Sequence, residues 1–255
     1  MGKVYSILSG KGGVGKTTSV INLAAALNEL GKDVLVVDAN LSTPNIGLHL
    51  GAPLVPITLN HVLDKRAEII DAIYEHSSGL KILPSSLSIK ELKRINHDRL
   101  IDIAKELRKL ADYILFDSSA GLGREAEASM GAADEIILIT QAEMPAIADA
   151  LKTSKLAESL NRDVRGFILN RHRSLRTEMP LQNIKDMLEL PHLGTVPEDR
   201  NMQKALALKN ALVYTHPRSI ASREYRKIAE KLLGEQYLKQ QEEKEKSFWQ
   251  RIFGR

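Results

Sequence analysis

A stretch rich in glycine and lysine near the N-terminus carries residue types that bind phosphate. Residues 9–18, SGKGGVGKTT, contain the spacing G-x-x-x-x-G-K-[ST] between an expected strand at 4–8 and an expected helix at 19–30. Glycines let backbone N–H groups fold around phosphate oxygens, and the following helix directs its positive dipole end at them. In such a loop Lys16 neutralises the β- and γ-phosphates, and the Thr17 hydroxyl binds Mg²⁺. The predicted nucleotide-binding residues are Gly10, Lys11, Gly12, Gly13, Val14, Gly15, Lys16, Thr17 and Thr18.

Two aspartates stand where they could hold a metal ion beside that phosphate. Residues 33–38 (DVLVVD) and 112–117 (DYILFD) are apolar runs, typical of strands buried on both faces, and each ends in an aspartate. At the carboxyl edge of a parallel sheet, Asp38 and Asp117 would lie near the phosphate loop. Asp38 could instead cap the segment after Ser42. We predict a Mg²⁺ site formed by Thr17, Asp38 and Asp117.

Strand-like and helix-like patterns alternate along most of the chain. This alternation favours a parallel sheet covered by helices on both faces. Beyond the strands already named, further strands are expected at residues 79–83, 135–140, 164–170 and 193–196. Further helices are expected at residues 58–63, 68–74, 87–95, 99–110, 145–159, 180–189 and 222–233.

The additional lysine of the phosphate loop, Lys11, makes the loop similar to one particular motif. The sequence resembles the deviant Walker A motif, K-G-G-x-G-K-[ST], of the MinD/ParA family of P-loop ATPases, and the nucleotide motifs keep the family's order over residues 3–233. The resemblance implies a three-layer α/β P-loop NTPase fold, with a mostly parallel central β-sheet flanked by helices on both faces. It also implies that Lys11 reaches the partner's nucleotide in an ATP-bound homodimer. A local phosphate contact or a solvated charge is the alternative for Lys11.

Two loops resemble the switch regions of MinD, and each departs from the family at one position. In residues 38–51, Asn40 stands where the D-x-D pattern has its second aspartate, and an amide cannot accept a proton. We expect Asn40 to orient the attacking water and turnover to be slow, although Asn40 could be only a turn residue. Residues 117–126, DSSAGLGREA, match the second switch with Ser119 in place of proline, and Gly121 could present its N–H to the γ-phosphate. The predicted catalytic residues are Lys11, Lys16 and Asn40.

The resemblance also implies where the adenine lies. Asn170 ends the expected strand 164–170, and its amide would pair with the adenine edge, unless it only terminates the strand. The loop over the purine would be formed by Pro197, Glu198 and Asp199. The implied cofactors are ATP or ADP with Mg²⁺, and the implied reaction converts ATP and water to ADP and phosphate.

Composition limits the class of protein. The 255 residues are 43% hydrophobic and 27% charged, which suits one α/β domain, predicted over residues 1–234. No cysteine is present, so disulfides, cysteine-ligated zinc and iron–sulfur clusters are excluded, and with them a metal-cluster carrier. No run of 18 apolar residues occurs, and the first strand leaves no room for a signal peptide, so a cytoplasmic protein is expected. The net charge of +4 permits contact with acidic lipid or nucleic acid but demonstrates neither.

The C-terminal residues change character twice. Residues 235–246, EQYLKQQEEKEK, read as a charged linker or helix extension. In residues 247–255, SFWQRIFGR, four apolar side chains share an arc of about 140° on a helical wheel, with basic residues opposite. This pattern is typical of a helix in a membrane interface, although the segment could pack on its own domain or on a partner. The predicted membrane-binding residues are Phe248, Trp249, Arg251, Ile252 and Phe253.

The favoured interpretation is a MinD-like ATPase that dimerises on ATP, binds an anionic membrane surface peripherally and positions cellular machinery through regulatory or cargo proteins. One alternative is a ParA-type ATPase that binds DNA nonspecifically. The P-Q that commonly follows the first switch in ParA proteins is absent here, and Thr43, Pro44 and Asn45 stand in that place. A second alternative is a scaffold that binds ATP with negligible hydrolysis. Exposed arginines that could contact DNA are Arg171, Arg173, Arg176, Arg218, Arg223 and Arg226.

Overall fold

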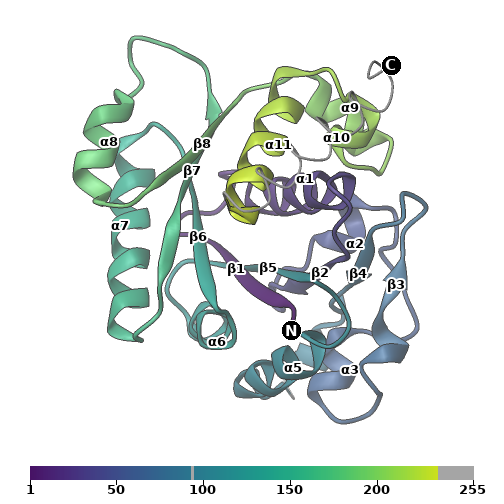
Figure 1. The fold of residues 1–255 in the computed structure, drawn as a ribbon. Coiled ribbons are helices and arrows are strands. Elements are labelled where there is room, and N and C mark those ends of the chain that lie inside the picture. The colour runs from purple at the N-terminus through teal and green to yellow at the C-terminus, as the bar shows by residue number, and fades with distance from the viewer. Residues whose placement is uncertain (93–94, 235–255) are drawn as a thin grey trace, which may run out of the picture.

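The structure is a computed structural model that describes residues 1–92 and 95–234. Within these residues eight strands form one sheet in the order β3-β4-β2-β5-β1-β6-β7-β8 (Figure 1). All neighbouring strands pair in parallel except β3, which runs antiparallel to β4 at one edge. The strands are β1 Lys3–Ser9, β2 Val34–Ala39, β3 Tyr74–Glu75, β4 Lys81–Leu83, β5 Tyr113–Ala120, β6 Glu135–Thr140, β7 Val164–His172 and β8 His192–Pro197.

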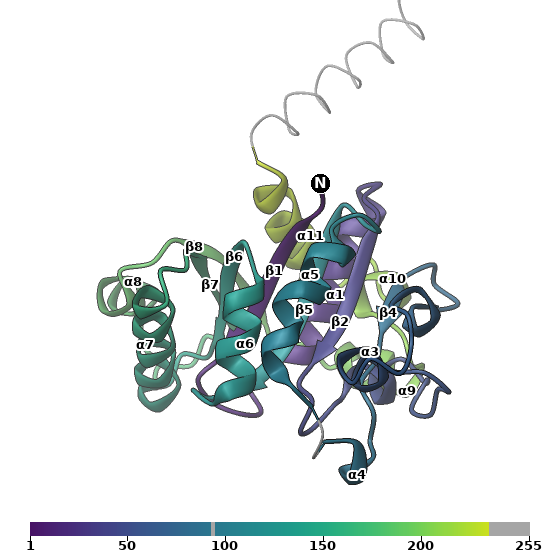
Figure 2. The ribbon, with the colours of Figure 1, turned by 90° about the horizontal axis from the view of Figure 1, so that it is seen from below.

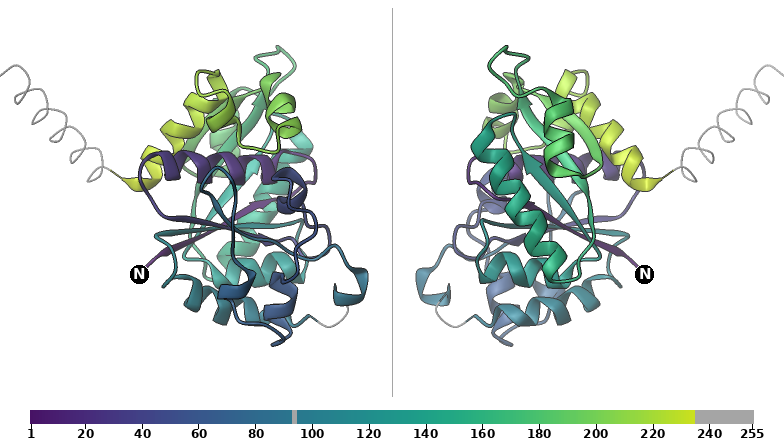
Figure 3. Two further views of the ribbon diagram at one scale, coloured as in Figure 1. Left: turned by 90° about the vertical axis from the view of Figure 1, so that its right-hand side faces the viewer. Right: turned by 90° about the vertical axis from the view of Figure 1, so that its left-hand side faces the viewer.

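Helices cover both faces of the sheet, as predicted. Helices α1 and α11 lie on one face, and α5 and α6 lie on the other, where Figure 2 looks onto them (Figures 2 and 3). The helices are α1 Lys16–Glu29, α2 Ile46–His49, α3 Leu59–Leu63, α4 Ile89–Leu92, α5 Leu100–Leu107, α6 Arg124–Ala132, α7 Met144–Ser159, α8 Leu181–Leu188, α9 Asn201–Ala207, α10 Leu212–Thr215 and α11 Ile220–Leu233. None of the described helices is long and apolar enough to cross a membrane.

The apolar runs in the sequence are explained by burial on two sides. In β2, Val34 and Val36 belong to the core beneath α1 and α11, whereas Leu35 and Val37 belong to the core beneath α3 and α5. Successive side chains of a strand point to opposite faces, so a strand covered twice needs an apolar residue at each position. Because these central strands are parallel, their carboxyl ends lie at the same edge of the sheet. The predicted site residues lie at that edge.

Several boundaries differ from the prediction. The prediction of a helix at residues 68–74 is wrong. A 3₁₀ turn forms at Ile70–Ala72, and Tyr74 begins β3. The Tyr74 hydroxyl donates to the carbonyl of Ile57 at 2.9 Å, and the strand pairs with β4, so tertiary contacts override the local pattern. Helix α1 begins three residues earlier than expected. Helices α2, α6, α9 and α10 were not predicted.

Candidate functional site

The phosphate loop joins β1 to α1, and its glycines are required by the space around them. Gly15 is the N-cap of α1 with φ 90°, a left-handed conformation that side chains other than glycine rarely adopt. A Cβ atom on Gly15 would lie 2.4 Å from Nδ2 of Asn170. A Cβ atom on Gly10 would lie 2.3 Å from the backbone carbonyl of Asp149. The loop therefore closes against β7 and α7, which fixes its position relative to the sheet.

Lys16 and Thr17, on the first turn of α1, both contact the carboxylate of Asp117, three residues before the end of β5. Lys16 Nζ lies 2.5 Å from Oδ1, and Thr17 Oγ1 donates to Oδ2 at 2.6 Å. The Lys16 side chain is 8% exposed and that of Asp117 is fully buried. The predicted phosphate lysine, metal-binding hydroxyl and metal-binding carboxylate thus converge at one point.

Asp38 joins this group from the neighbouring strand. It pairs directly with Asp117 in the parallel β2–β5 register, and it is fully buried. Burial, followed by the negative charge of Asp117, raises the pKa of Asp38 to about 8, although the backbone N–H groups of Ile46 and Asn45 oppose the shift. Both N–H groups donate to Oδ2 of Asp38 at 2.9 Å. Asp38 therefore fixes the start of α2, as the capping alternative predicted, and its role as a metal ligand stays a prediction.

These residues fit a Mg²⁺ ion that is bound together with phosphates. Mg²⁺ takes few protein ligands, typically one or two carboxylates or hydroxyls, and completes its shell with water and phosphate oxygens. Among the described residues no group of three or more His, Cys, Asp or Glu side chains could hold a metal alone. A cationic group, Lys16 Nζ, already lies against Asp117, which demonstrates that the carboxylate accepts positive charge there.

Asn40 lies at the carboxyl end of β2, and its amide is already in use. Its Nδ2 donates to the carbonyl of Thr43 at 2.7 Å, and its Oδ1 accepts from the Thr43 hydroxyl at 3.1 Å. The side chain is buried and closes the turn that follows β2. A role in orienting water requires these two bonds to rearrange.

The two switch loops contact one another. The backbone N–H and hydroxyl of Ser42, in the first switch, both donate to the carboxylate of Glu125 on α6. In the second switch, Gly121 has φ 89° and its N–H donates to the carbonyl of Ser9 at 3.0 Å. The N–H predicted to meet the γ-phosphate is therefore paired with the phosphate loop in this structure.

Beneath these loops three hydroxyls form a closed group with no exposure to solvent. Ser6 on β1 lies 2.9 Å from Ser118 on β5 and 2.7 Å from Ser129 on α6, and Ser118 also bonds Ser129. All three residues are fully buried. They attach α6 to the centre of the sheet.

The predicted adenine residues line one cavity of about 400 Å³. Asn170 donates through Nδ2 to the carbonyl of Val14 at 2.7 Å, so it also braces the phosphate loop. Asp199 accepts from the N–H of Asn201, the first residue of α9, at 2.9 Å, while Glu198 pairs with Arg173 at 2.6 Å. The cavity is lined by Gly15, Thr18, Asn170, Arg171, Pro197, Glu198, Asp199, Arg200, Met202, Gln203 and Leu206.

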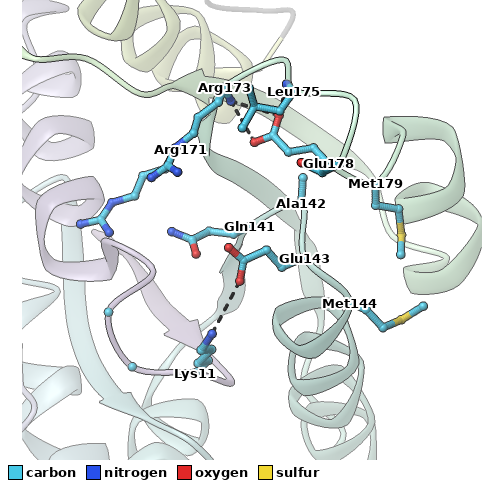
Figure 4. A pocket seen from close by; sticks show the side chains of 13 residues that line it. Lys11, Gln141, Ala142, Glu143, Met144, Arg171, Arg173, Leu175, Glu178 and Met179 are labelled. Atoms are coloured by element: carbon cyan, nitrogen blue, oxygen red, sulfur yellow. Dashed lines mark hydrogen bonds and ion pairs between the residues drawn. The ribbon is translucent and has the colours of Figure 1, made fainter.

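Lys11 lies apart from the other lysine, at a second cavity of about 710 Å³ (Figure 4). Its Nζ is 3.6 Å from Oε2 of Glu143, and its side chain is 46% exposed. Figure 4 shows Lys11 and Glu143 on one side of this cavity, with Arg171 and Arg173 at another edge. Lys11 therefore points to an open surface, in contrast to the buried Lys16.

Three side chains near the site were not assigned to it from the sequence: Glu125, Glu143 and Arg171, of which Arg171 was considered only as a DNA contact. Glu125 and Glu143 follow the ends of β5 and β6, and Arg171 lies in the last residues of β7. Their position at the carboxyl edge of the sheet is the signal that could have identified them. The predicted membrane-binding residues 248, 249 and 251–253 lie outside the described residues.

Known proteins resemble the chain over most of its length. Residues 2–165 match the family described as AAA domain. An ATP-binding protein of Methanocaldococcus jannaschii is 38% identical over 259 residues, covering 100% of this chain and 98% of that protein. The septum site-determining protein MinD of Pyrococcus horikoshii, solved with Mg-ADP, has a TM-score of 0.87 at 34% identity, covering 91% of this chain and 96% of that one. A chain of the MinC:MinD cell division protein complex of Aquifex aeolicus has a TM-score of 0.83 at 28% identity, covering 91% and 96%.

Proposed function

Because the chain belongs to the MinD/ParA family of P-loop ATPases and uses ATP or ADP with Mg²⁺, we propose that it is a MinD-like ATPase. It hydrolyses ATP to ADP and phosphate, slowly, and uses the ATP-bound state to form a homodimer. The proposal extends the domain over residues 1–234, with the linker and the membrane segment after it. Release of phosphate from Mg-ATP under single-turnover conditions tests hydrolysis. Tight ATP binding without phosphate release would favour the scaffold interpretation.

The observation that supports this function best is the cluster of Lys16, Thr17 and Asp117, joined by Asp38. Phosphoryl transfer involves little covalent chemistry by the protein. It depends mainly on positively charged groups beside the transferred phosphate and on a metal ion held in place. With nucleotide bound, Lys16 would turn from Asp117 to the phosphates, and Asp117 would then be free to hold Mg²⁺ through its water. Thr17 would supply a hydroxyl ligand. When bound, the metal would supply charge neutralisation at the phosphates.

Asn40 offers a direct test of what limits turnover. We expect Asn40→Asp to raise single-turnover hydrolysis about 10- to 100-fold, which is about 1.4–2.7 kcal/mol of barrier. The carboxylate introduced at position 40 can accept a proton from water. It also loses the hydrogen bond that Nδ2 of Asn40 donates to the Thr43 carbonyl, so the side chain can rotate toward the phosphate more easily. Thr43→Val is the matched control, because it removes the hydroxyl bond to Asn40 without adding a base. An unchanged or lower rate in Asn40→Asp would mean that another residue positions the attacking water.

The ATP-dependent dimer is supported by Lys11. Its half-exposed ammonium group borders a cavity at the protein surface and has only a 3.6 Å ion pair with Glu143. An exposed pair of this kind contributes little, so Lys11 is available for a stronger contact with phosphate. A second copy of the chain that brings its phosphate loop to this cavity would supply that contact.

Membrane association is proposed from residues 247–255. Four apolar side chains give about 6–12 kcal/mol if they are fully buried, but partial burial and ordering of so short a helix leave only a small part of it. One tail should therefore bind marginally, and an ATP dimer presents two tails. Pairing raises avidity without any new contact.

We expect ATP to raise the affinity for anionic liposomes about 100-fold over ADP, as measured by co-sedimentation. Phe248→Glu, or truncation after Lys246, should remove this effect, and high salt should weaken it. Gln250→Ala, on the polar side of the predicted helix, is the control and should bind like wild type. Equal binding by the truncated chain would exclude the tail as the anchor.

The positioning role and its protein partners are proposed from the relatives, one of which is solved as a MinC:MinD complex. DNA binding is less favoured than membrane binding. Two of the arginines that it would use are engaged, since Arg226 Nε pairs with Glu29 and Arg173 Nε pairs with Glu198, each at 2.6 Å. ATP-dependent co-sedimentation with DNA that falls steeply with salt would reverse this preference.

A further inference from the structure

A bulge at the end of β7 gives Arg171 an unusual backbone. In the pairing of β7 with β8, Leu169 lies opposite Thr195 and His172 lies opposite Pro197, so β7 contains one extra residue. Arg171 takes up this insertion with φ 53°, in the left-handed region. That region is unfavourable for an arginine, and a bulge of this kind re-aims a side chain. The strain marks a position where the direction of the side chain matters.

The bulge directs the Arg171 side chain to the border between two parts of the nucleotide site. Its Nε lies 3.7 Å from a Cβ built on Gly15, the residue that begins α1. Arg171 lines the cavity of Asn170, Pro197 and Asp199, and it also lines the cavity of Lys11. It therefore lies between the predicted adenine residues and the phosphate loop.

Among the described residues, the Arg171 side chain lacks the ion pair that each of its basic neighbours has. Lys16 pairs with Asp117, Lys11 pairs with Glu143, and Arg173 pairs with Glu198. Within residues 1–92 and 95–234, the guanidinium of Arg171 has no hydrogen bond or ion pair, although its charge acts on the buried Tyr225 hydroxyl. A free guanidinium beside a helix N-terminus provides a bidentate donor for an anionic oxygen.

We propose that Arg171 binds the α-phosphate of the nucleotide held by the same chain. A nucleotide with its base among Asn170, Pro197 and Asp199 and its terminal phosphates at Lys16 places its ribose and α-phosphate between them. That is the border at which the Arg171 side chain lies. The inference rests on the nucleotide site of the proposed function, and it requires neither hydrolysis nor dimerisation.

The test compares Arg171→Gln with Arg171→Lys and with the control Arg176→Gln, which changes an exposed arginine of the loop after β7 that lines neither cavity. Calorimetric titration with Mg-ADP should give an affinity about 10- to 100-fold lower for Arg171→Gln. Arg171→Lys should recover part of the loss, and Arg176→Gln should match wild type. Adenosine, which has no phosphate, should bind wild type and Arg171→Gln equally in ligand-observed NMR. Wild-type ADP affinity in Arg171→Gln, or an equal loss for adenosine, would overturn the proposal.

A second variant separates binding from folding. Asparagine tolerates the left-handed region, so the nucleotide-free Arg171→Asn protein should unfold at the wild-type temperature or higher, while its ADP affinity falls as in Arg171→Gln. A lower unfolding temperature for Arg171→Asn would make Arg171 a structural residue and overturn the proposal. A chain that binds ADP through Arg171 but releases no phosphate from ATP would overturn the proposed hydrolysis alone.

Discussion

Replacing Lys16 with alanine is expected to abolish tight Mg-ATP binding and to destabilise the nucleotide-free protein by about 3–5 kcal/mol. Lys16 contacts the buried carboxylate of Asp117, and its charge also favours the ionised form of the buried Asp38. Its removal leaves a buried charge without a partner, which costs far more than the pair contributed in net stability. Urea denaturation at pH 8 measures the change.

The destabilisation should depend on pH and on Asp117. Because the pKa of Asp38 is raised to about 8 in the folded protein, the stability that this group contributes is present below about pH 4 and is lost as the pH rises to 8. The cost of Lys16→Ala should therefore shrink as the pH is lowered. Lys16→Ala with Asp117→Asn should recover most of the stability but not Mg-ATP binding. Full stability of Lys16→Ala alone at pH 8 would contradict the argument.

Replacing Lys11 with alanine should weaken the ATP dimer about 10²- to 10⁴-fold while the monomer keeps its affinity for ATP. In a symmetric dimer each lysine contacts the partner's phosphates, so the substitution removes two charge-assisted contacts of about 1.5–3 kcal/mol each. The half-exposed position of Lys11 on a surface cavity is consistent with small effects on folding. Light scattering with ATP and with ADP measures the mass of each variant.

Lys105→Ala is the control for this experiment. Lys105 is an exposed lysine on α5, and its one ion pair among the described residues is with Asp102 in the preceding turn. Helix α5 lies on the face of the sheet away from α1 (Figure 2). The Lys105→Ala protein should therefore dimerise with ATP as the wild-type protein does. If wild type has the same mass with ATP and ADP, or if Lys11→Ala still dimerises, the nucleotide switch at Lys11 is excluded.

The sequence predicted those parts of the site that depend on local spacing. The phosphate loop and the strands that carry Asp38 and Asp117 are each encoded within ten residues, so that composition and periodicity identify them, although the strands continue to Ala39 and Ala120. The parallel sheet followed from the same apolar runs. The helix predicted at residues 68–74 was wrong at Tyr74, because a two-residue edge strand has no periodicity of its own. Such a strand forms only by pairing with its neighbour, here β4.

Contacts between distant residues could not be predicted in this way. Asn170 braces the carbonyl of Val14 from 156 residues away, and Glu125 bonds Ser42 from 83 residues away. For Asn170 the resemblance implied an adenine contact, with termination of the strand as the alternative, and neither interpretation included the hydrogen bond of its amide to the loop. The strained backbone of Arg171 follows from a register shift between β7 and β8, which local sequence does not encode.

The three buried hydroxyls of Ser6, Ser118 and Ser129 have a mechanical consequence. A closed ring lets each hydroxyl donate one bond and accept one, so all three are satisfied without water, and α6 is fixed to the sheet at Ser129. The start of α6 lies five residues away, or about 7.5 Å along its axis. We therefore expect any tilt of α6 about Ser129 to move its first turn, which carries Glu125, more than the residues next to Ser129, and so to weaken the bond between Glu125 and Ser42.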